Sequence, residues 1–196
     1  MHRCCAILLI AALCCAAESL AQVGGRIDAD VSRPASVDAP RTIEAAFGPE
    51  AGAEALIIKV IATAKISIRL AGFAFSSPVI VAELISAKKR GVDVRVVVDR
   101  RHNVDEDEKG IGRKALALLA RSHVAIRTNS DYRILHDKFL IVDERHVQTG
   151  SYNYAVSSNK NSENVLVVWN DPSLAVAYLQ HWEFRFKAGT DYSMQK

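Results

Sequence analysis

Strand-like apolar runs alternate with amphipathic helical segments over most of this chain, and this alternation restricts its fold more than any other feature. The alternation is typical of an α/β domain. We therefore predict a single α/β domain whose mixed, largely parallel β-sheet is flanked by helices on both faces. The strand-like runs are residues 65–75, 92–99, 124–128, 139–142, 146–151 and 163–170, and helical periodicity occupies 56–64, 77–91, 112–122 and a last segment from 171 onward.

Two of the predicted helices carry clear signals at their ends. Ser77 can cap a helix whose first residue is Pro78, and Gly91 can close it. Asp171 and Pro172 likewise begin the last helix. That helix carries an apolar stripe expected to pack on the sheet, made of Leu174, Tyr178, Trp182 and Phe186.

The first 21 residues have the pattern of a secretory signal peptide. Arg3 gives a basic start, an apolar run covers residues 4–17, and Ser19-Leu20-Ala21 is a small-x-small cleavage pattern. Residues 22–41 are polar and contain glycine and proline, which predicts a flexible linker. We expect a folded domain over residues 42–196 of the 196-residue chain, in the periplasm or secreted.

All four cysteines, at positions 4, 5, 14 and 15, lie inside the predicted signal peptide. The mature chain would then have no cysteine, which excludes a thiol nucleophile and a cysteine-ligated metal. The formal net charge of the whole chain is +3. Such mild basicity permits a polyanionic partner without requiring one.

Residues 136–153 gather polar side chains around an apolar run in a hairpin-like segment. The turn-like break is residues 143–146. An even-numbered loop centred there would set Lys138 opposite Ser151 and His136 opposite Asn153. Because side chains alternate along strands, all four would then share one face.

The four side chains of this predicted face have complementary chemistry. An imidazole can act as nucleophile or proton donor, and an ammonium, a hydroxyl and a carboxamide can donate hydrogen bonds to phosphate oxygens. Such a set suits phosphoryl transfer without a metal ion or another cofactor.

The same residues resemble a known motif. His136, Lys138 and Asp143, followed by Gly150-Ser151-x-Asn153, are similar to the HKD motif of the phospholipase D superfamily. From about residue 47 to 192 the chain most resembles the small secreted bacterial endonucleases of the Nuc type, which carry one HKD motif per chain. Asp143 points to the opposite face of the predicted hairpin, so we expect a structural role for it.

The resemblance implies a role for each site residue. His136 would be the nucleophile that forms a phosphohistidine, and Lys138, Ser151 and Asn153 would hold the phosphate. Glu163 would accept a hydrogen bond from the histidine and fix its tautomer. One motif supplies one histidine, so the resemblance also implies a homodimer with one composite site, in which the second copy of His136 is the general acid.

The predicted activity is metal-independent hydrolysis of DNA phosphodiesters with little sequence specificity, and RNA stays open as a second nucleic-acid substrate. Two alternatives are a lipid phosphodiesterase of the phospholipase D type and a catalytically silent module that binds phosphate or nucleic acid. Turnover of DNA against phosphatidyl substrates separates the first two. A trapped phosphohistidine would exclude the third.

The remaining signals are weaker. The acidic stretch 103–110 lacks the glycine and glutamate of a calcium loop, so we predict a solvated loop. Structural roles are expected for the other histidines that follow the linker, His102, His123, His146 and His181. The basic residues 88–90 and 100–101 either steer DNA or end a helix and a strand. At 7% aromatic residues the sequence shows no base-stacking platform, which favours backbone binding.

Overall fold

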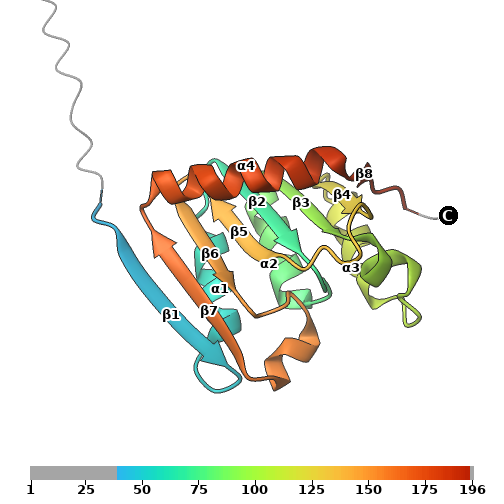
Figure 1. The fold of residues 1–196 in the computed structure, drawn as a ribbon, viewed down its shortest axis with the longest axis horizontal. Coiled ribbons are helices and arrows are strands. Elements are labelled where there is room, and N and C mark those ends of the chain that lie inside the picture. The colour runs from blue at the N-terminus through green and yellow to red at the C-terminus, as the bar shows by residue number, and fades with distance from the viewer. Residues whose placement is uncertain (1–38, 195–196) are drawn as a thin grey trace, which may run out of the picture. The chain divides into compact units, whose positions relative to one another are not determined.

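The computed structural model describes residues 39–194 of the chain. The predicted signal peptide and all but the last three residues of the predicted linker lie outside this range. Eight strands form one sheet in the order β1-β7-β6-β5-β2-β3-β4-β8 (Figure 1). The strands are β1 (Thr42–Gly48), β2 (Ser67–Gly72), β3 (Asp93–Asp99), β4 (Ala125–Asn129), β5 (Lys138–Val142), β6 (His146–Gly150), β7 (Glu163–Trp169) and β8 (Thr190–Asp191).

The sheet is mixed, as predicted, but it is less parallel than the alternation suggested. Parallel pairing is confined to β2, β3 and β4. The other neighbours pair antiparallel, so two of the seven pairings among the described strands are parallel. The reason is that β5 and β6 form a hairpin and β7 also returns beside β6, whereas among neighbouring strands of the sheet only β2, β3 and β4 are joined by crossover helices.

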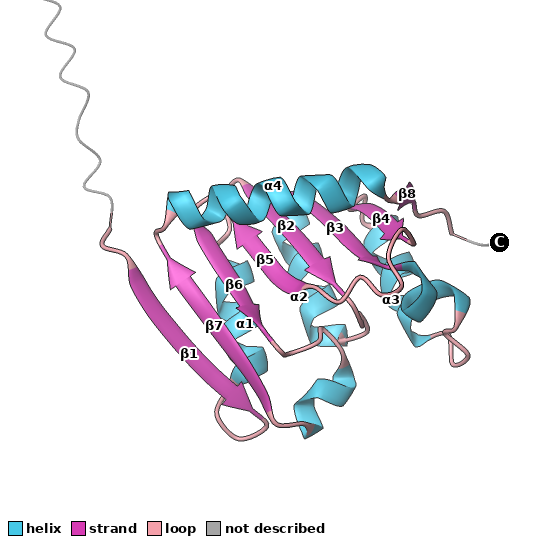
Figure 2. Ribbon diagram, viewed as in Figure 1, coloured by secondary structure: helices cyan, strands magenta, loops and turns pink. Residues whose placement is uncertain are grey.

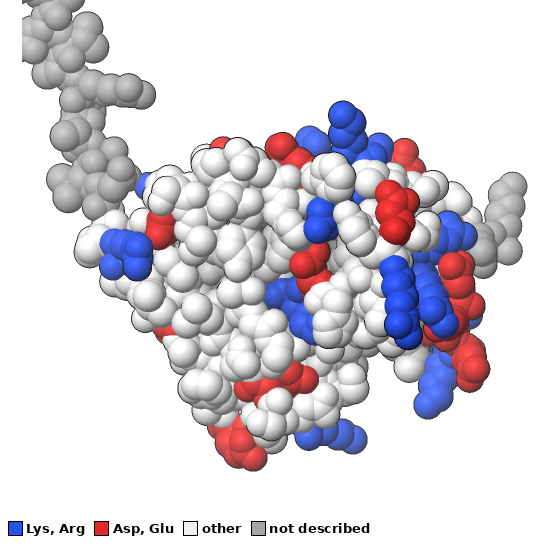
Figure 3. Space-filling view, viewed as in Figure 1, with Lys and Arg blue, Asp and Glu red and all other residues white. Residues whose placement is uncertain are grey.

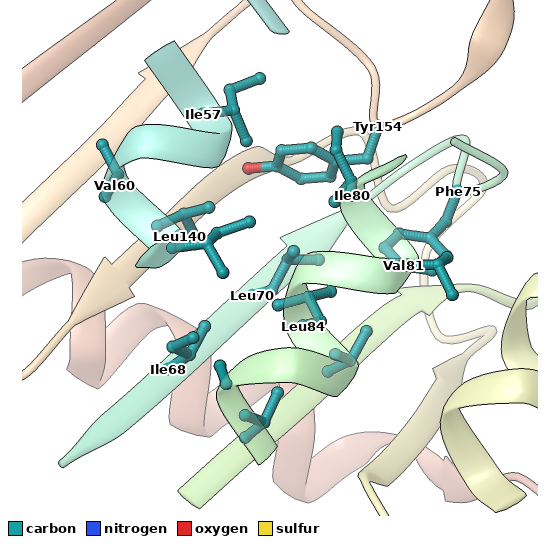
Figure 4. Close-up of a cluster of buried hydrophobic side chains, with 14 of the residues drawn as sticks. Ile57, Val60, Ile68, Leu70, Phe75, Ile80, Val81, Leu84, Leu140 and Tyr154 are labelled. Atoms are coloured by element: carbon teal, nitrogen blue, oxygen red, sulfur yellow. The ribbon is translucent and has the colours of Figure 1, made fainter. Parts of the chain in front are cut away.

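Helices cover both faces of the sheet, as expected (Figure 2). The face opposite α4 holds the larger core, in which Tyr154 lies among aliphatic side chains of two helices and the sheet (Figure 4). On the other face α4 packs over β2 to β6 through a second apolar cluster. The helices are α1 (Ala53–Thr63), α2 (Pro78–Lys89), α3 (Ile111–Arg121) and α4 (Pro172–Ala188), and two short turns are the π-helical Arg101–Asp105 and the 3-10 Val156–Lys160.

The predicted helix ends are confirmed. The Ser77 hydroxyl accepts a hydrogen bond from the Ile80 amide at 3.4 Å, and Pro78 is the first residue of α2. The Asp171 carboxylate accepts from the Leu174 amide at 3.0 Å at the start of α4. The predicted stripe of α4 forms part of the second cluster, in which Trp182 is 2% exposed. No helix within residues 39–194 is both long and apolar enough to cross a membrane.

Strands β1 and β8 were not expected from the sequence. β1 lies at the edge of the sheet and pairs with β7 from Thr42↔Trp169 to Gly48↔Glu163. Its apolar side chains Ile43 and Phe47 are more than half exposed. A strand at the edge of a sheet that buries few side chains leaves no clear apolar periodicity in the sequence. β1 was therefore not predicted, because it forms by pairing with β7.

The predicted register of the β5–β6 hairpin is wrong by one residue. Val142 pairs with His146 and Phe139 with Thr149, so the loop has three residues, 143–145. This ladder continues with Lys138 facing Gly150 rather than Ser151. The extra loop residue is accommodated because Asp143 and Glu144 adopt left-handed backbone angles, with φ of 52° and 53°.

Candidate active site

The predicted site residues meet at one edge of the sheet although the hairpin register differs from the prediction. Gly72 at the end of β2 pairs with Lys138 at the start of β5. β6 returns to the same edge at Gly150, and β7 leaves it at Glu163. This is the lower edge of the sheet in Figure 1, where the parallel strands β2 and β3 also end. The carboxyl ends of parallel strands are the usual place for a site in an open α/β sheet.

Lys138 places a nearly buried ammonium group at this edge. The residue is 8% exposed, and its Nζ donates to the carbonyl oxygen of His136 at 2.9 Å. The same Nζ lies 5.5 Å from the ring centroid of Phe73. Burial lowers the pKa of Lys138, and the nearby carboxylates of Asp137 and Glu163 oppose that shift.

His136 is exposed and its ring is free of hydrogen bonds within residues 39–194. The ring packs against Phe73, with 5.0 Å between the two ring centroids. Both ring nitrogens are therefore available to a ligand or to another chain. This availability is what a nucleophilic imidazole requires.

Ser151 and Glu163 are linked directly. The Ser151 hydroxyl donates to Oε2 of Glu163 and accepts from the amide of Asn164 at 3.0 Å. The other carboxylate oxygen of Glu163 accepts from Asn161 Nδ2 at 3.1 Å. The described part of the chain forms no hydrogen bond between Glu163 and His136, the bond that the family resemblance implies.

Asn153 has a buried side-chain oxygen without a hydrogen-bond partner among the described residues. Its neighbours Tyr152 and Tyr154 are buried and hold the segment: the Tyr152 hydroxyl donates to Asn159, and the Tyr154 hydroxyl donates to Gln148 Oε1 at 2.7 Å. Burial raises the pKa of both tyrosines, so both stay neutral. A buried amide oxygen without a partner is uncommon in proteins, and this one can accept a hydrogen bond from a ligand or from water.

Gly150 is required between Thr149 and Ser151 by a close backbone approach. A Cβ atom at position 150 would lie 2.1 Å from the carbonyl oxygen of Asn164. The next amide, that of Ser151, donates to this same oxygen at 3.1 Å. The glycine of the motif thus allows β7 to approach closely enough to place Ser151 beside Glu163.

Asp143 lies at the opposite edge and has the structural role that its parity predicted. Its carboxylate accepts hydrogen bonds from the backbone amides of Lys65, Ile66 and Ser67 at 2.9, 2.8 and 2.8 Å. These bonds attach the hairpin loop to the start of β2. The aspartate of the motif therefore stabilises the scaffold rather than contacting the site.

Sequence reasoning missed the polar residues that position the loops around His136. Asp99 is 2% exposed, and its carboxylate accepts from the amides of His102 at 2.7 Å and Leu135 at 2.8 Å. The buried Asn103 side chain donates to the carbonyl oxygen of Phe73 at 2.6 Å. The one local signal was the aspartate that ends the apolar run of β3, which has no partner nearby in sequence.

The other histidines and basic residues take up varied positions. The His146 ring accepts a hydrogen bond from the Asn170 amide at 3.0 Å, and burial lowers the pKa of His146. His181 lies 3.1 Å from an Asp137 oxygen and, with His136, lines a pocket of about 470 Å³. Arg90, the residue after α2, donates to the carbonyl oxygen of Ile61 in α1 at 3.2 Å.

The acidic loop expected to be solvated carries ion pairs to the basic residues beside it. Arg100 pairs with Asp105 at 3.3 Å, and Arg101 pairs with Glu106 at 2.6 Å. Across the described range, no group of three or more histidine, cysteine or acidic side chains is arranged to hold a metal ion.

Comparison with known proteins identifies relatives. Residues 57–187 match the family described as "Cardiolipin synthase, PLD-like domain". A phospholipase D of Rickettsia prowazekii is 34% identical over 141 residues, which are 71% of this chain and 65% of that protein. The human mitochondrial cardiolipin hydrolase is 32% identical over 128 residues, 65% of this chain and 48% of that protein. The chain thus spans about two thirds or less of these relatives.

Solved structures show the same fold. The Salmonella typhimurium protein Nuc, a phospholipase D family member, aligns with a TM-score of 0.75 and 40% identity over 78% of this chain and 99% of its own. NucT from Helicobacter pylori, at 19% identity, has a TM-score of 0.67 over 78% of this chain and 100% of its own, and shows the fold alone. Because the family match covers more than half of its residues, the chain belongs to the phospholipase D-like domain family.

Proposed function

We propose that this protein is a metal-independent phosphodiesterase that hydrolyses the backbone of nucleic acids, DNA first and RNA by the same chemistry, with little sequence specificity. The observation that supports it most is the meeting, at one sheet edge, of three groups. They are the imidazole of His136, which forms no hydrogen bond within residues 39–194, the desolvated ammonium of Lys138 and the side-chain amide of Asn153, whose Oδ1 has no partner there. The proposed location, after removal of a signal peptide, is the periplasm or the exterior.

In the first proposed step, a ring nitrogen of His136 attacks phosphorus. A nitrogen–phosphorus bond forms while the bond from phosphorus to the leaving oxygen breaks, and a second imidazole gives that oxygen a proton. Lys138 donates through Nζ and Asn153 through Nδ2 to the non-bridging oxygens, where negative charge increases. Ser151 joins them when its hydroxyl proton turns from Glu163 Oε2 to the phosphate. Because Lys138 is desolvated, its charge interacts more strongly than it would in water.

In the second proposed step, water attacks the phosphohistidine. The second imidazole, now neutral, accepts the proton from water, the nitrogen–phosphorus bond breaks, and a phosphate monoester leaves. His136 is regenerated, and every proton is returned. The products from nucleic acid are a 5′-phosphate and a 3′-hydroxyl end.

The second imidazole is proposed to be His136 of a second copy of the chain. An uncovered part of the sheet beside the site favours such a partner. On the face that α4 covers, α4 packs over β2 to β6 and leaves β1 and β7 uncovered. There Ile43, Phe47 and Leu166 are 58%, 56% and 36% exposed. Figure 3 shows a largely uncharged surface over β6 and β7. A second copy packed on this face would bury it beside the incomplete site.

The function is tested by nicking of supercoiled plasmid DNA with residues 22–196 and excess EDTA. We expect cleavage that EDTA does not inhibit and that His136→Ala abolishes. A matched control is His123→Asn, an exposed histidine in the turn between α3 and β4, and it should cleave normally. Absence of cleavage by the unmodified protein would contradict the nuclease proposal.

Subunit mixing tests the composite site. If both copies of His136 serve one site, an equal mixture of the unmodified protein and His136→Ala should, after subunit exchange, retain about one quarter of the activity, since only unmodified pairs work. Chains that act alone would retain about one half. The latter result, with exchange verified by differently tagged chains, would contradict the dimeric site.

A lipid phosphodiesterase is the second candidate, because relatives of this chain are named phospholipase D and mitochondrial cardiolipin hydrolase. The same nucleophile could attack a lipid phosphodiester. Release of headgroup from phosphatidylglycerol or cardiolipin vesicles, with no cleavage of plasmid, would favour it. Acid-labile phosphate trapped on His136 would exclude a silent binding module.

A further inference from the structure

A pocket of about 260 Å³ next to the candidate site is not used by the proposed chemistry. Three segments distant in sequence contribute to it: the end of β2, the π-helical turn after β3 and the chain just before His136. Its lining includes Phe73, Arg101, His102, Arg133 and Ile134.

The pocket and the site share an aromatic row. The Phe73 ring centroid lies 5.0 Å from that of His136 and 4.4 Å from that of His102. His102 is exposed, so its flat ring is accessible from the pocket side. The sequence showed no stacking platform because these rings come from different loops.

The pocket lining carries two acidic side chains, Asp99 and Glu106, and two arginines, of which one is unpaired in the described part of the chain. Arg101 is paired with Glu106 at 2.6 Å, whereas Arg133 is exposed and has no hydrogen bond, ion pair or ring contact within residues 39–194. Arg133 precedes His136 by three residues, a backbone span of at most about 10 Å. Its guanidinium can therefore reach a phosphate close to the one that His136 would attack.

The two walls of the pocket are fixed by a buried carboxylate. Asp99 accepts from the amide of His102 on one wall at 2.7 Å and from that of Leu135 on the other at 2.8 Å. Asn103 holds the Phe73 carbonyl oxygen in the same region. The walls are thus held together by hydrogen bonds of the chain itself, which reduces the ordering cost of binding.

We propose that this pocket binds a nucleotide that flanks the scissile phosphate in a single-stranded nucleic acid. Arg133 holds the phosphate of that nucleotide, and its base stacks on His102 beside Phe73. A single strand fits because its base faces are available, whereas those in a duplex are stacked on their neighbours. The inference rests on the proposed function, since it assigns a substrate class to the same site.

Binding tests the inference independently of cleavage. The affinity of the full mature protein for a fluorescein-labelled single-stranded oligodeoxynucleotide is measured by anisotropy for the unmodified protein, Arg133→Ala and His102→Ala. Each substitution should weaken binding roughly tenfold. Arg121→Ala is the matched control, because Arg121 is an exposed arginine at the end of α3, near the start of β4 and away from the site edge, and should leave binding unchanged.

The outcomes separate this inference from the proposed function. Unchanged affinity for the oligonucleotide in either Arg133→Ala or His102→Ala would overturn the inference. It would also be overturned if the two substitutions weakened binding only to phosphatidylglycerol vesicles. Hydrolysis of bis(p-nitrophenyl) phosphate by the unmodified protein, a diester without a flanking nucleotide, reports on the chemistry alone and therefore on the proposed function. If the protein cleaves nothing yet binds the oligonucleotide through Arg133 and His102, the proposed function fails, while the binding of a single-stranded nucleic acid at this pocket stands.

Discussion

Asp143 is the residue of the HKD motif whose contacts indicate a structural rather than a chemical role. Its carboxylate accepts three backbone hydrogen bonds, from Lys65, Ile66 and Ser67, and its own φ of 52° is left-handed. We therefore expect substitutions of Asp143 to lower stability and to spare turnover in the molecules that stay folded. Asp143→Asn and Asp143→Ala test this in graded steps.

The expected magnitudes follow from the contacts. In Asp143→Asn the amide oxygen can still accept from Ile66 and Ser67, while the amide nitrogen faces the Lys65 amide, so one bond is lost, at a cost of about 1 kcal/mol. Asp143→Ala loses all three, partly replaced by water, and places alanine in a left-handed conformation, for a total of about 3 kcal/mol. For a domain of this size these values correspond to falls in Tm of about 2–4 °C and 6–12 °C.

Thermal denaturation followed by circular dichroism gives Tm, and turnover is measured well below the lower Tm. Asp131→Ala is the control, because Asp131 is exposed and its side chain forms no hydrogen bond or ion pair among residues 39–194. A Tm for Asp143→Ala equal to that of the control would refute the anchoring argument. Lost turnover with an unchanged Tm would instead show that Asp143 takes part in the chemistry.

Three further predictions concern packing, burial and pH. Gly150→Ala should lower the free energy of unfolding in urea by more than about 2 kcal/mol, because the new Cβ would lie 2.1 Å from the Asn164 carbonyl oxygen. Gly52→Ala is the comparison, since a Cβ there meets no atom within 4 Å. Its left-handed φ of 76° should still cost about 1 kcal/mol. Lys138→Met should keep or raise Tm, since it removes a desolvated charge, yet lower turnover at least about a hundredfold. Burial lowers the pKa of His146, so its contribution to stability is present above the unfolded value near ~6.5 and is lost as pH falls through the folded value. The loss of Tm from about pH 7 to pH 5 should therefore be smaller in His146→Asn.

Local patterns in the sequence predicted the four helices and six of the eight strands that the structure describes, and a motif selected the candidate site residues. Burial periodicity predicted the central strands, and Ser77 and Asp171 predicted the helix starts. The motif predicted His136, Lys138, Ser151, Asn153 and Glu163 as one group, and the sheet topology brings their segments to one edge. These features depend on a few neighbouring residues, which is why the sequence determines them by itself.

Tertiary structure decided the hairpin register and the surroundings of the nucleophile. The three-residue loop depends on the attachment of Asp143 to the start of β2, and an edge strand such as β1 exists only because β7 pairs with it. Phe73 and His102 meet because Asp99 and Asn103 tie three loops together through buried hydrogen bonds. Such contacts join residues far apart along the chain, so their energies leave no periodic pattern in the sequence and appear only once the sheet is assembled.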